Sequence, residues 1–215
     1  MEPKTPTRRS PEAGERVRDA ERTKQKLLDA ALTEFSAKGY SGARVGEIAA
    51  RAGVNKQLIS YYFGGKEGLY RAMHRESLET EYENANADVP PDELLRWYLH
   101  NSLSDPRFVR LALWQALSGE TPDDETQADV DIEQERMKRR QERGEIAADV
   151  DTAALQLALM GMTFAPTAFS HTARRLFGVD IDDPEFEHRY FSTLKRILGA
   201  LAEGAEHPQK GNTLP

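Results

Sequence analysis

Apolar residues recur at helical spacing along almost the whole chain of 215 residues, and no stretch of any length alternates as a strand does. Residues three or four apart lie on one face of a helix, so each such segment has one side to bury. Glycine and proline separate these segments from one another. The pattern therefore predicts an all-α protein of about nine helices.

Two short helical segments in the first third are joined by a tight corner. Ala49 is small enough for one helix to approach the other, Gly53 tolerates the positive φ of the turn, and Ile59 points back into the angle. Asn55 is a good N-cap for the second of these helices. The other inward positions are Ile48, Ala52, Val54 and Tyr62. This spacing predicts a helix-turn-helix, whose second helix enters the major groove of DNA.

The charges are distributed unevenly around this motif. Residues 1–75 carry 15 Lys and Arg against 9 Asp and Glu, whereas residues 76–215 carry 14 against 27, which gives the formal net charge of −7. The attraction of phosphate is local, because salt screens it within about 8 Å under physiological conditions. A basic first third on an acidic body therefore suits a protein with one end that faces DNA.

The same segment resembles the DNA-binding domain of the tetracycline-repressor (TetR) family over about 50 residues, from Thr23 to Met73. The matching positions are Gly39-Tyr40, Val45, Ile48-Ala49, Ala52-Gly53-Val54-Asn55, Tyr61-Tyr62-Phe63, Lys66-Glu67 and Leu69. The resemblance implies a repressor with a helical C-terminal region that binds small molecules, and a dimer held by a bundle of the last two helices of each subunit. It also implies a pseudo-palindromic operator as the DNA partner.

We expect the DNA-facing residues to lie on and around the third helix. Lysine at a helix start donates to a guanine edge or a phosphate, and glutamine pairs with adenine. Ser60 replaces the aromatic residue common in the family, and Arg44 stands where Ser or Thr usually caps the second helix, which gives up a cap worth about 1 kcal/mol. The candidate DNA-binding residues are Arg44, Lys56, Gln57, Ser60, Tyr61, Tyr62 and Lys66.

The rest of the chain is expected to hold an effector site and the dimer contact. Aromatic residues and methionine suit an apolar or aromatic ligand, although each also suits ordinary core packing. Pro166 is expected to kink the apolar helix 151–169 around such a site. The candidate ligand-binding residues are Met73, Tyr98, Leu111, Trp114, Phe164 and Phe169, and the candidate dimer residues are Phe186, Tyr190, Leu194, Ile197 and Leu201.

The expected domain organisation follows from these patterns. It comprises a flexible tail over 1–20, a helix-turn-helix domain over 21–68, a helical ligand-binding and dimerisation domain over 69–207, and a flexible tail over 208–215. No apolar run reaches the roughly 18 residues of a membrane span, and the first 22 residues lack an apolar signal stretch. We therefore expect a cytoplasmic protein without membrane contact.

Two other functions fit parts of the sequence. The chain has no cysteine and none of the phosphate-loop, dinucleotide or nucleophile-elbow motifs of enzymes, so we expect neither an enzyme nor a cofactor. Glu185 and His188 have the spacing of di-iron bundles, but no second copy exists, and so no metal site is expected. The alternative that remains open is an architectural or protein-regulated DNA-binding protein without a small-molecule ligand.

Overall fold

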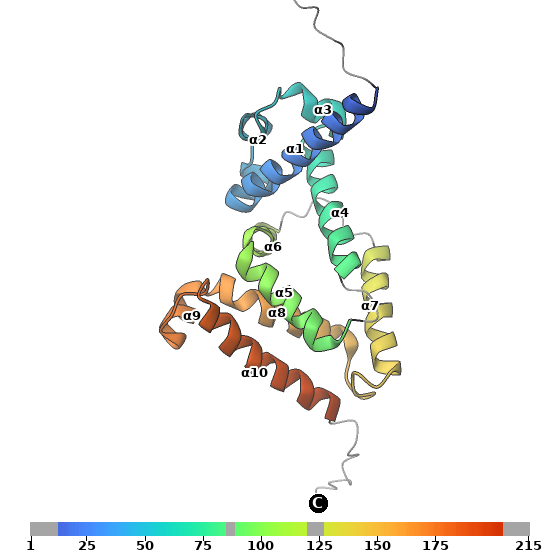
Figure 1. Ribbon diagram of the computed structural model, residues 1–215, viewed down its shortest axis with the longest axis vertical. Helices are drawn as coiled ribbons and strands as arrows, with labels where there is room; N and C mark the ends of the chain where they lie inside the picture. The colour runs from blue at the N-terminus through green and yellow to red at the C-terminus, as the bar shows by residue number, and fades with distance from the viewer. Residues whose placement is uncertain (1–12, 85–88, 120–126, 204–215) are drawn as a thin grey trace, which may run out of the picture.

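The computed structural model describes residues 13–84, 89–119 and 127–203, and this part of the chain is entirely helical (Figure 1). The all-α prediction is therefore confirmed. The helices are α1 (Ala13–Gly42), α2 (Val45–Ala52), α3 (Gln57–Phe63), α4 (Lys66–Asn84), α5 (Pro91–Ser104), α6 (Arg107–Ser118), α7 (Gln127–Glu142), α8 (Thr152–Ala168), α9 (Ser170–Phe177) and α10 (Pro184–Glu203).

The described residues form ten helices where about nine were expected, because the chain bends by 83° between α8 and α9. A second difference lies at the start of the chain. Helix α1 begins at Ala13, so residues 13–20, which were expected in the flexible tail, are helical. Residues 1–12 and 204–215 lie outside the described residues, and with them the rest of both expected tails.

The molecule has two parts, with α4 running from one toward the other (Figure 1). Helices α1, α2 and α3 form the head, and helices α5 to α10 form the body. The core of the head is built from Leu27, Ala31 and Phe35 of α1, which recur every fourth residue and face α2, α3 and α4. Leu111 of α6 joins the same core, so one hydrophobic cluster continues from the head into the body.

The body has a smaller core between α5 and α10, which contains Leu95, Leu99, Phe191 and Leu194. Helix α8 packs Leu159 and Met162 against this core. It is also tied to α5 by polar contacts: the Ser102 hydroxyl donates to the Thr163 carbonyl at 2.8 Å, and the Thr167 hydroxyl donates to the Ser102 carbonyl at 2.9 Å. No single helix in the described part is long and apolar enough to cross a bilayer. Only α8 and α9 taken together reach that length and apolarity, across their 83° bend.

Pro166 lies inside α8, two residues before the helix ends at Ala168. Proline has no backbone N–H, so the carbonyl of Met162, four residues earlier, loses its helical donor. The Tyr190 hydroxyl of α10 donates to that carbonyl at 2.8 Å. A contact from another helix thus compensates for the proline and ties α10 to α8.

Candidate nucleic-acid interface

The corner between α2 and α3 has the geometry that its residues predict. Gly53 is left-handed, with φ of 68°, and its N–H donates to the carbonyl of Ala50. The N–H of Val54 reaches back to the carbonyl of Ala49 at 3.0 Å, which closes the end of α2. Ala49 and Ile59 are both buried where the two helices meet. The head therefore contains the expected helix-turn-helix.

Asn55 fixes the start of α3. Its side-chain oxygen accepts a hydrogen bond from the N–H of Gln57 at 2.9 Å, as an N-cap does. Exposed side chains follow on one side of the helix: Lys56, Gln57, Ser60 and Tyr61. Tyr61 is 78% exposed, an unusual setting for a large aromatic ring in a monomer. The exposed side of α3 therefore offers one cation, two hydrogen-bonding side chains and one aromatic ring to a partner.

Tyr62 is placed differently from its neighbour. It is half-buried against the core of the head, and its ring contacts that of Tyr61 at a centroid distance of 5.0 Å. The ammonium group of Lys24 on α1 lies 5.8 Å from the Tyr62 ring centroid. Most of this side chain is therefore committed to holding α3 against the rest of the head.

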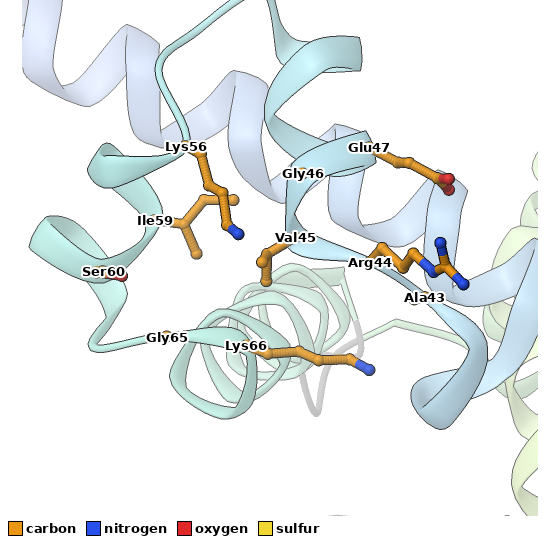
Figure 2. A pocket seen from close by; sticks show the side chains of 10 residues that line it. All are labelled: Ala43, Arg44, Val45, Gly46, Glu47, Lys56, Ile59, Ser60, Gly65 and Lys66. Atoms are coloured by element: carbon orange, nitrogen blue, oxygen red, sulfur yellow. The ribbon is translucent and has the colours of Figure 1, made fainter.

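A hollow of about 620 Å³ opens between α2, α3 and the start of α4 (Figure 2). Three cations line it from three different elements: Arg44 before α2, Lys56 before α3, and Lys66 at the start of α4. The remaining lining residues are Ala43, Val45, Gly46, Glu47, Ile59, Ser60 and Gly65. We call this feature the cationic hollow. Its charge suits a phosphate group.

Two of these cations differ in how their side chains are placed. The Lys66 ammonium donates to the carbonyl of Ser41 at 3.3 Å and lies 4.7 Å from the ring centroid of Tyr40, which keeps it at the edge of the hollow. Arg44 makes no side-chain hydrogen bond to the first turn of α2, which agrees with the expected loss of a cap. Its guanidinium extends away from Lys56, on the side of Glu47 (Figure 2).

The sequence reasoning missed a cluster of charges behind the hollow. Lys38 of α1 pairs with Glu34 at 2.5 Å and with Glu47 of α2. Hydrogen bonds to these two carboxylates raise the pKa of Lys38, and the bond from Lys38 holds the pKa of Glu47 below its ordinary value. The spacing of four residues between Glu34 and Lys38 was the only available signal, because the contact with Glu47 depends on how α2 packs on α1.

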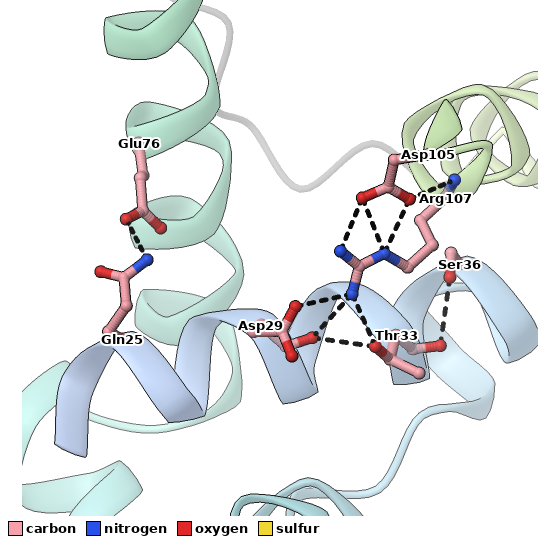
Figure 3. A network of polar contacts seen from close by, with 7 residues as sticks. All are labelled: Gln25, Asp29, Thr33, Ser36, Glu76, Asp105 and Arg107. Carbon is pink, nitrogen blue, oxygen red and sulfur yellow. Dashed lines mark hydrogen bonds and ion pairs between the residues drawn. The ribbon is translucent and has the colours of Figure 1, made fainter. Parts of the chain in front are cut away.

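The head and the body are joined by polar contacts around the first turn of α6 (Figure 3). The Arg107 guanidinium binds Asp105 beside it and reaches across to α1, where it donates to Asp29 Oδ1 at 2.7 Å and to the Thr33 hydroxyl at 2.9 Å. The same guanidinium lowers the pKa of the Asp105 carboxyl. Farther along α6, Gln115 donates to the Tyr70 hydroxyl of α4 at 2.6 Å.

The six candidate ligand-binding residues lie in different settings. Met73 and Leu111 are buried in the cluster shared by head and body, Tyr98 and Phe164 are half-buried, and Trp114 and Phe169 are exposed. Trp114 lines a shallow hollow of about 420 Å³ between α1 and α6, together with Ser36, Ala37, Arg110, Leu113 and Leu117. Its ring covers Gly39, where a Cβ atom would approach to 3.1 Å.

The predicted dimer stripe on α10 is directed mostly into its own subunit. Phe186 and Leu194 are buried there and have almost no surface left for a partner. Tyr190 is half-buried by its bond to Met162, whereas Ile197 is 42% exposed. The side chain of Leu201 lies outside the described residues. The helical spacing of apolar residues along α10 indicates that one face is buried. It does not indicate whether that face packs against the same subunit or against a second one.

The residue pair that resembled a metal motif is engaged elsewhere. The Glu185 carboxylate pairs with Arg189 at 3.2 Å, one turn along α10. In the part of the chain that the structure describes, no three His, Asp or Glu side chains gather closely enough to hold a metal ion.

Comparison with known proteins gives a consistent result. Residues 27–73 match the family model described as bacterial regulatory proteins, tetR family. The chain is 32% identical over 158 residues to the HTH-type transcriptional repressor SCO4008 of Streptomyces coelicolor. This alignment covers 68% of this chain and 79% of that protein. It is 36% identical over 113 residues to the HTH-type transcriptional regulator RutR of Escherichia coli, but this covers only 49% of this chain and 53% of RutR.

Two solved structures share the fold. A Streptomyces coelicolor protein described as a transcriptional regulator, SCO4942, superposes with a TM-score of 0.64 at 21% identity, over 81% of this chain and 97% of that one. The fatty acid degradation regulator FadR of Bacillus halodurans gives a TM-score of 0.57 at 17% identity, over 84% and 98% of the two chains. At these identities the likeness extends to the helical architecture alone.

Proposed function

The chain belongs to the tetR family of bacterial regulatory proteins, and on that basis we propose that it is a homodimeric repressor that binds a pseudo-palindromic operator and is released by a small apolar or aromatic ligand. The observation that carries the DNA-binding part is the exposed side of α3 beside the cationic hollow. An exposed tyrosine, an amide and a hydroxyl next to three cations suit base edges flanked by phosphates.

The roles of the single residues follow from their positions. Gln57 and Ser60 present hydrogen-bonding groups to the base edges, and Lys56 donates to a base or a phosphate at the start of α3. Tyr61 contacts the sugar-phosphate backbone or a thymine methyl group. Arg44 and Lys66 receive the phosphates on either side of the hollow. Tyr62 serves chiefly to hold α3 in place.

The dimer contact is proposed on helices α8 and α9 with the exposed part of α10. Leu157 of α8 is 70% exposed, Leu176 of α9 is 75% exposed, and Met160 and Ile197 are also accessible. Exposed large apolar side chains are typical of an interaction surface. A second copy is the partner that the two-headed reading of an operator requires, because successive major grooves on one face lie about 34–36 Å apart.

The effector is proposed to act where the body meets the head. The cluster that contains Met73 and Leu111 spans both parts, and the Arg107 contacts fix α6 to α1. A ligand that moves α6 or α4 would change the separation of the two heads and weaken both half-sites together. An architectural or protein-regulated DNA-binding protein would use the same head without this step.

The test is fluorescence anisotropy of the full chain with DNA from immediately upstream of its own gene, against a scrambled duplex of equal length. We expect tight binding of the upstream duplex alone, and weaker binding by the Lys56→Ala variant. A library of small apolar and aromatic compounds is then screened for release of the complex. Equal binding of both duplexes would favour the architectural protein. Specific binding that no compound releases would leave a repressor without the proposed ligand step.

A further inference from the structure

A buried carboxylate lies close behind the proposed DNA-binding surface. The Glu34 side chain is only 2% exposed, and one of its oxygens pairs with Lys38 on the same helix. The other oxygen lies 3.8 Å from the Arg51 guanidinium on α2. A buried charge that loses its partner strongly destabilises the fold, so Glu34 depends on these cations at the contact between α1 and α2.

Lys38 also holds a second carboxylate, and this one faces the DNA-binding side. Glu47 is half-exposed, pairs with the Lys38 ammonium, and lines the cationic hollow among Arg44, Lys56 and Lys66. Lys38 itself does not line the hollow. Its direct link to the hollow is therefore the Glu47 carboxylate.

An uncompensated Glu47 would oppose DNA binding. It is the only acidic residue among those that line the hollow, so it would repel the phosphates that the three cations attract. The hydrogen bond from Lys38 satisfies the Glu47 carboxylate and turns it back toward α1, and the pKa values of both groups are shifted in the directions that favour the charged pair.

We propose that Lys38 is a positioning residue for DNA binding, which neutralises and orients the Glu47 carboxylate at the edge of the cationic hollow and thereby keeps that hollow receptive to phosphate. The inference rests on the proposed function, since it assigns the cationic hollow to DNA. It adds a role for two residues that neither the helix-turn-helix spacing nor the DNA-facing side of α3 indicates.

The experiment is a double-mutant cycle read by DNA affinity at several salt concentrations. The unaltered chain, Lys38→Gln, Glu47→Gln and the double variant are titrated against one duplex that the unaltered chain binds. We expect Lys38→Gln to weaken binding by about fivefold at low salt, and Glu47→Gln alone to change it less than about twofold. In the Lys38→Gln background, Glu47→Gln should reverse the roughly fivefold loss of affinity. The loss caused by Lys38→Gln should itself become smaller as the salt concentration rises.

Equal effects of Glu47→Gln in both backgrounds would overturn the proposal. That result would mean that Lys38 contacts a phosphate itself, or that it only stabilises the fold. The matched control is Lys195→Gln, since Lys195 forms the same kind of pair with Asp92 between α10 and α5, far from the head. This variant should leave DNA affinity unchanged.

A second cycle keeps the test decisive if Lys38→Gln unfolds the head by stranding Glu34. The same four variants are made in a Glu34→Gln background, where no buried charge remains to be compensated at that position. Glu47→Gln should still restore DNA affinity to the Lys38→Gln variant in this background. If it does not, the proposal is overturned. Failure of the unaltered chain to bind any duplex is a separate outcome, because it would contradict the proposed function before any variant is compared.

Discussion

The exposure of the Tyr61 side chain is explained by a binding partner better than by the stability of the fold. Its ring is 78% exposed at the surface of α3. We expect Tyr61→Ala to weaken operator binding by about 1 kcal/mol, or roughly fivefold, because it removes a contact of ordinary hydrogen-bond strength. The free energy of unfolding should change by no more than about 0.5 kcal/mol, as at other exposed positions.

Tyr62→Ala is the matched comparison for that experiment. Tyr62 packs against the core of the head, so its removal should destabilise the protein by about 2 kcal/mol. Binding titrations and thermal melts of both variants give the answer. A Tyr61 variant that unfolds early while binding DNA normally would show that the exposed ring serves the fold instead.

Position 53 favours glycine because of its backbone conformation, and not because a larger side chain would clash there. Its φ is 68°, and a Cβ added there would meet no atom within 4 Å. Gly53→Ala should therefore cost about 1–2 kcal/mol of stability from the left-handed conformation alone. Gly46→Ala, inside α2 and equally uncrowded, should stabilise by about 0.5–1 kcal/mol. Chemical denaturation that gives both changes the same sign would refute this explanation of the corner.

Local chemistry explains why single positions in the head could be predicted from the sequence. The cap at Asn55, the turn at Gly53 and the missing cap at Arg44 each depend on residues within a few positions. The pairing of Lys38 with Glu47 depends on how α2 packs on α1, and no short-range pattern encodes it. The settings of Met73 and Trp114 were beyond prediction for the same reason, since a large apolar side chain suits a core, a hollow or a surface equally well.

At the scale of the elements, the stability that the Asp105–Arg107 pair gives to the start of α6 should depend on pH. The Arg107 guanidinium lowers the pKa of the Asp105 carboxyl in the folded state. A depressed folded pKa gives stability that is fully present above the unfolded value of about 3.9 and is lost as pH falls through the folded pKa. Arg107→Gln should therefore reduce the melting temperature clearly at pH 7 and much less near pH 3.

Melting curves of the two proteins at both values of pH test this prediction. Asp29 and Thr33 remain in place in the variant, so the difference reports the guanidinium that joins them to α6. A gap between the two melting temperatures that is the same at both values of pH would mean that Asp105 contributes nothing to the junction.

The limits of the elements were predictable only where a local signal exists. Gly39, with φ of 69°, breaks the helical conformation inside α1, as a left-handed glycine does at a helix end. The start of α1 at Ala13 was missed, because a helix that projects from the core needs no apolar face. The extra helix α9 was missed because no glycine or proline stands at the 83° bend itself, and Pro166, which lies just before it, is accommodated inside α8.

For the whole molecule, the proposed dimer contact differs most from the contact that was predicted from the sequence. Buried Phe186 and Leu194 leave the exposed leucines of α8 and α9 as the better candidates. Leu157→Glu should convert the dimer to a monomer and weaken operator binding, because a charge would be buried at the contact. Leu117→Glu, at a still more exposed leucine on α6, should leave the dimer intact.

Sedimentation of the three proteins distinguishes these outcomes. A dimer that survives Leu157→Glu would place the contact on another face of the body. A monomer from the unaltered chain would remove the basis for two heads on one operator.

Sequence-specific reading by two symmetric heads is the central claim, and selection from a random pool of DNA duplexes tests it most directly. The full chain is used to enrich bound duplexes over several rounds, and the survivors are sequenced. We expect an inverted repeat whose half-sites are centred about one helical turn apart, 34–36 Å, or a small multiple of it, with an even number of chains on each duplex. A pool with no enriched sequence, or with one half-site bound by a single chain, would contradict the claim.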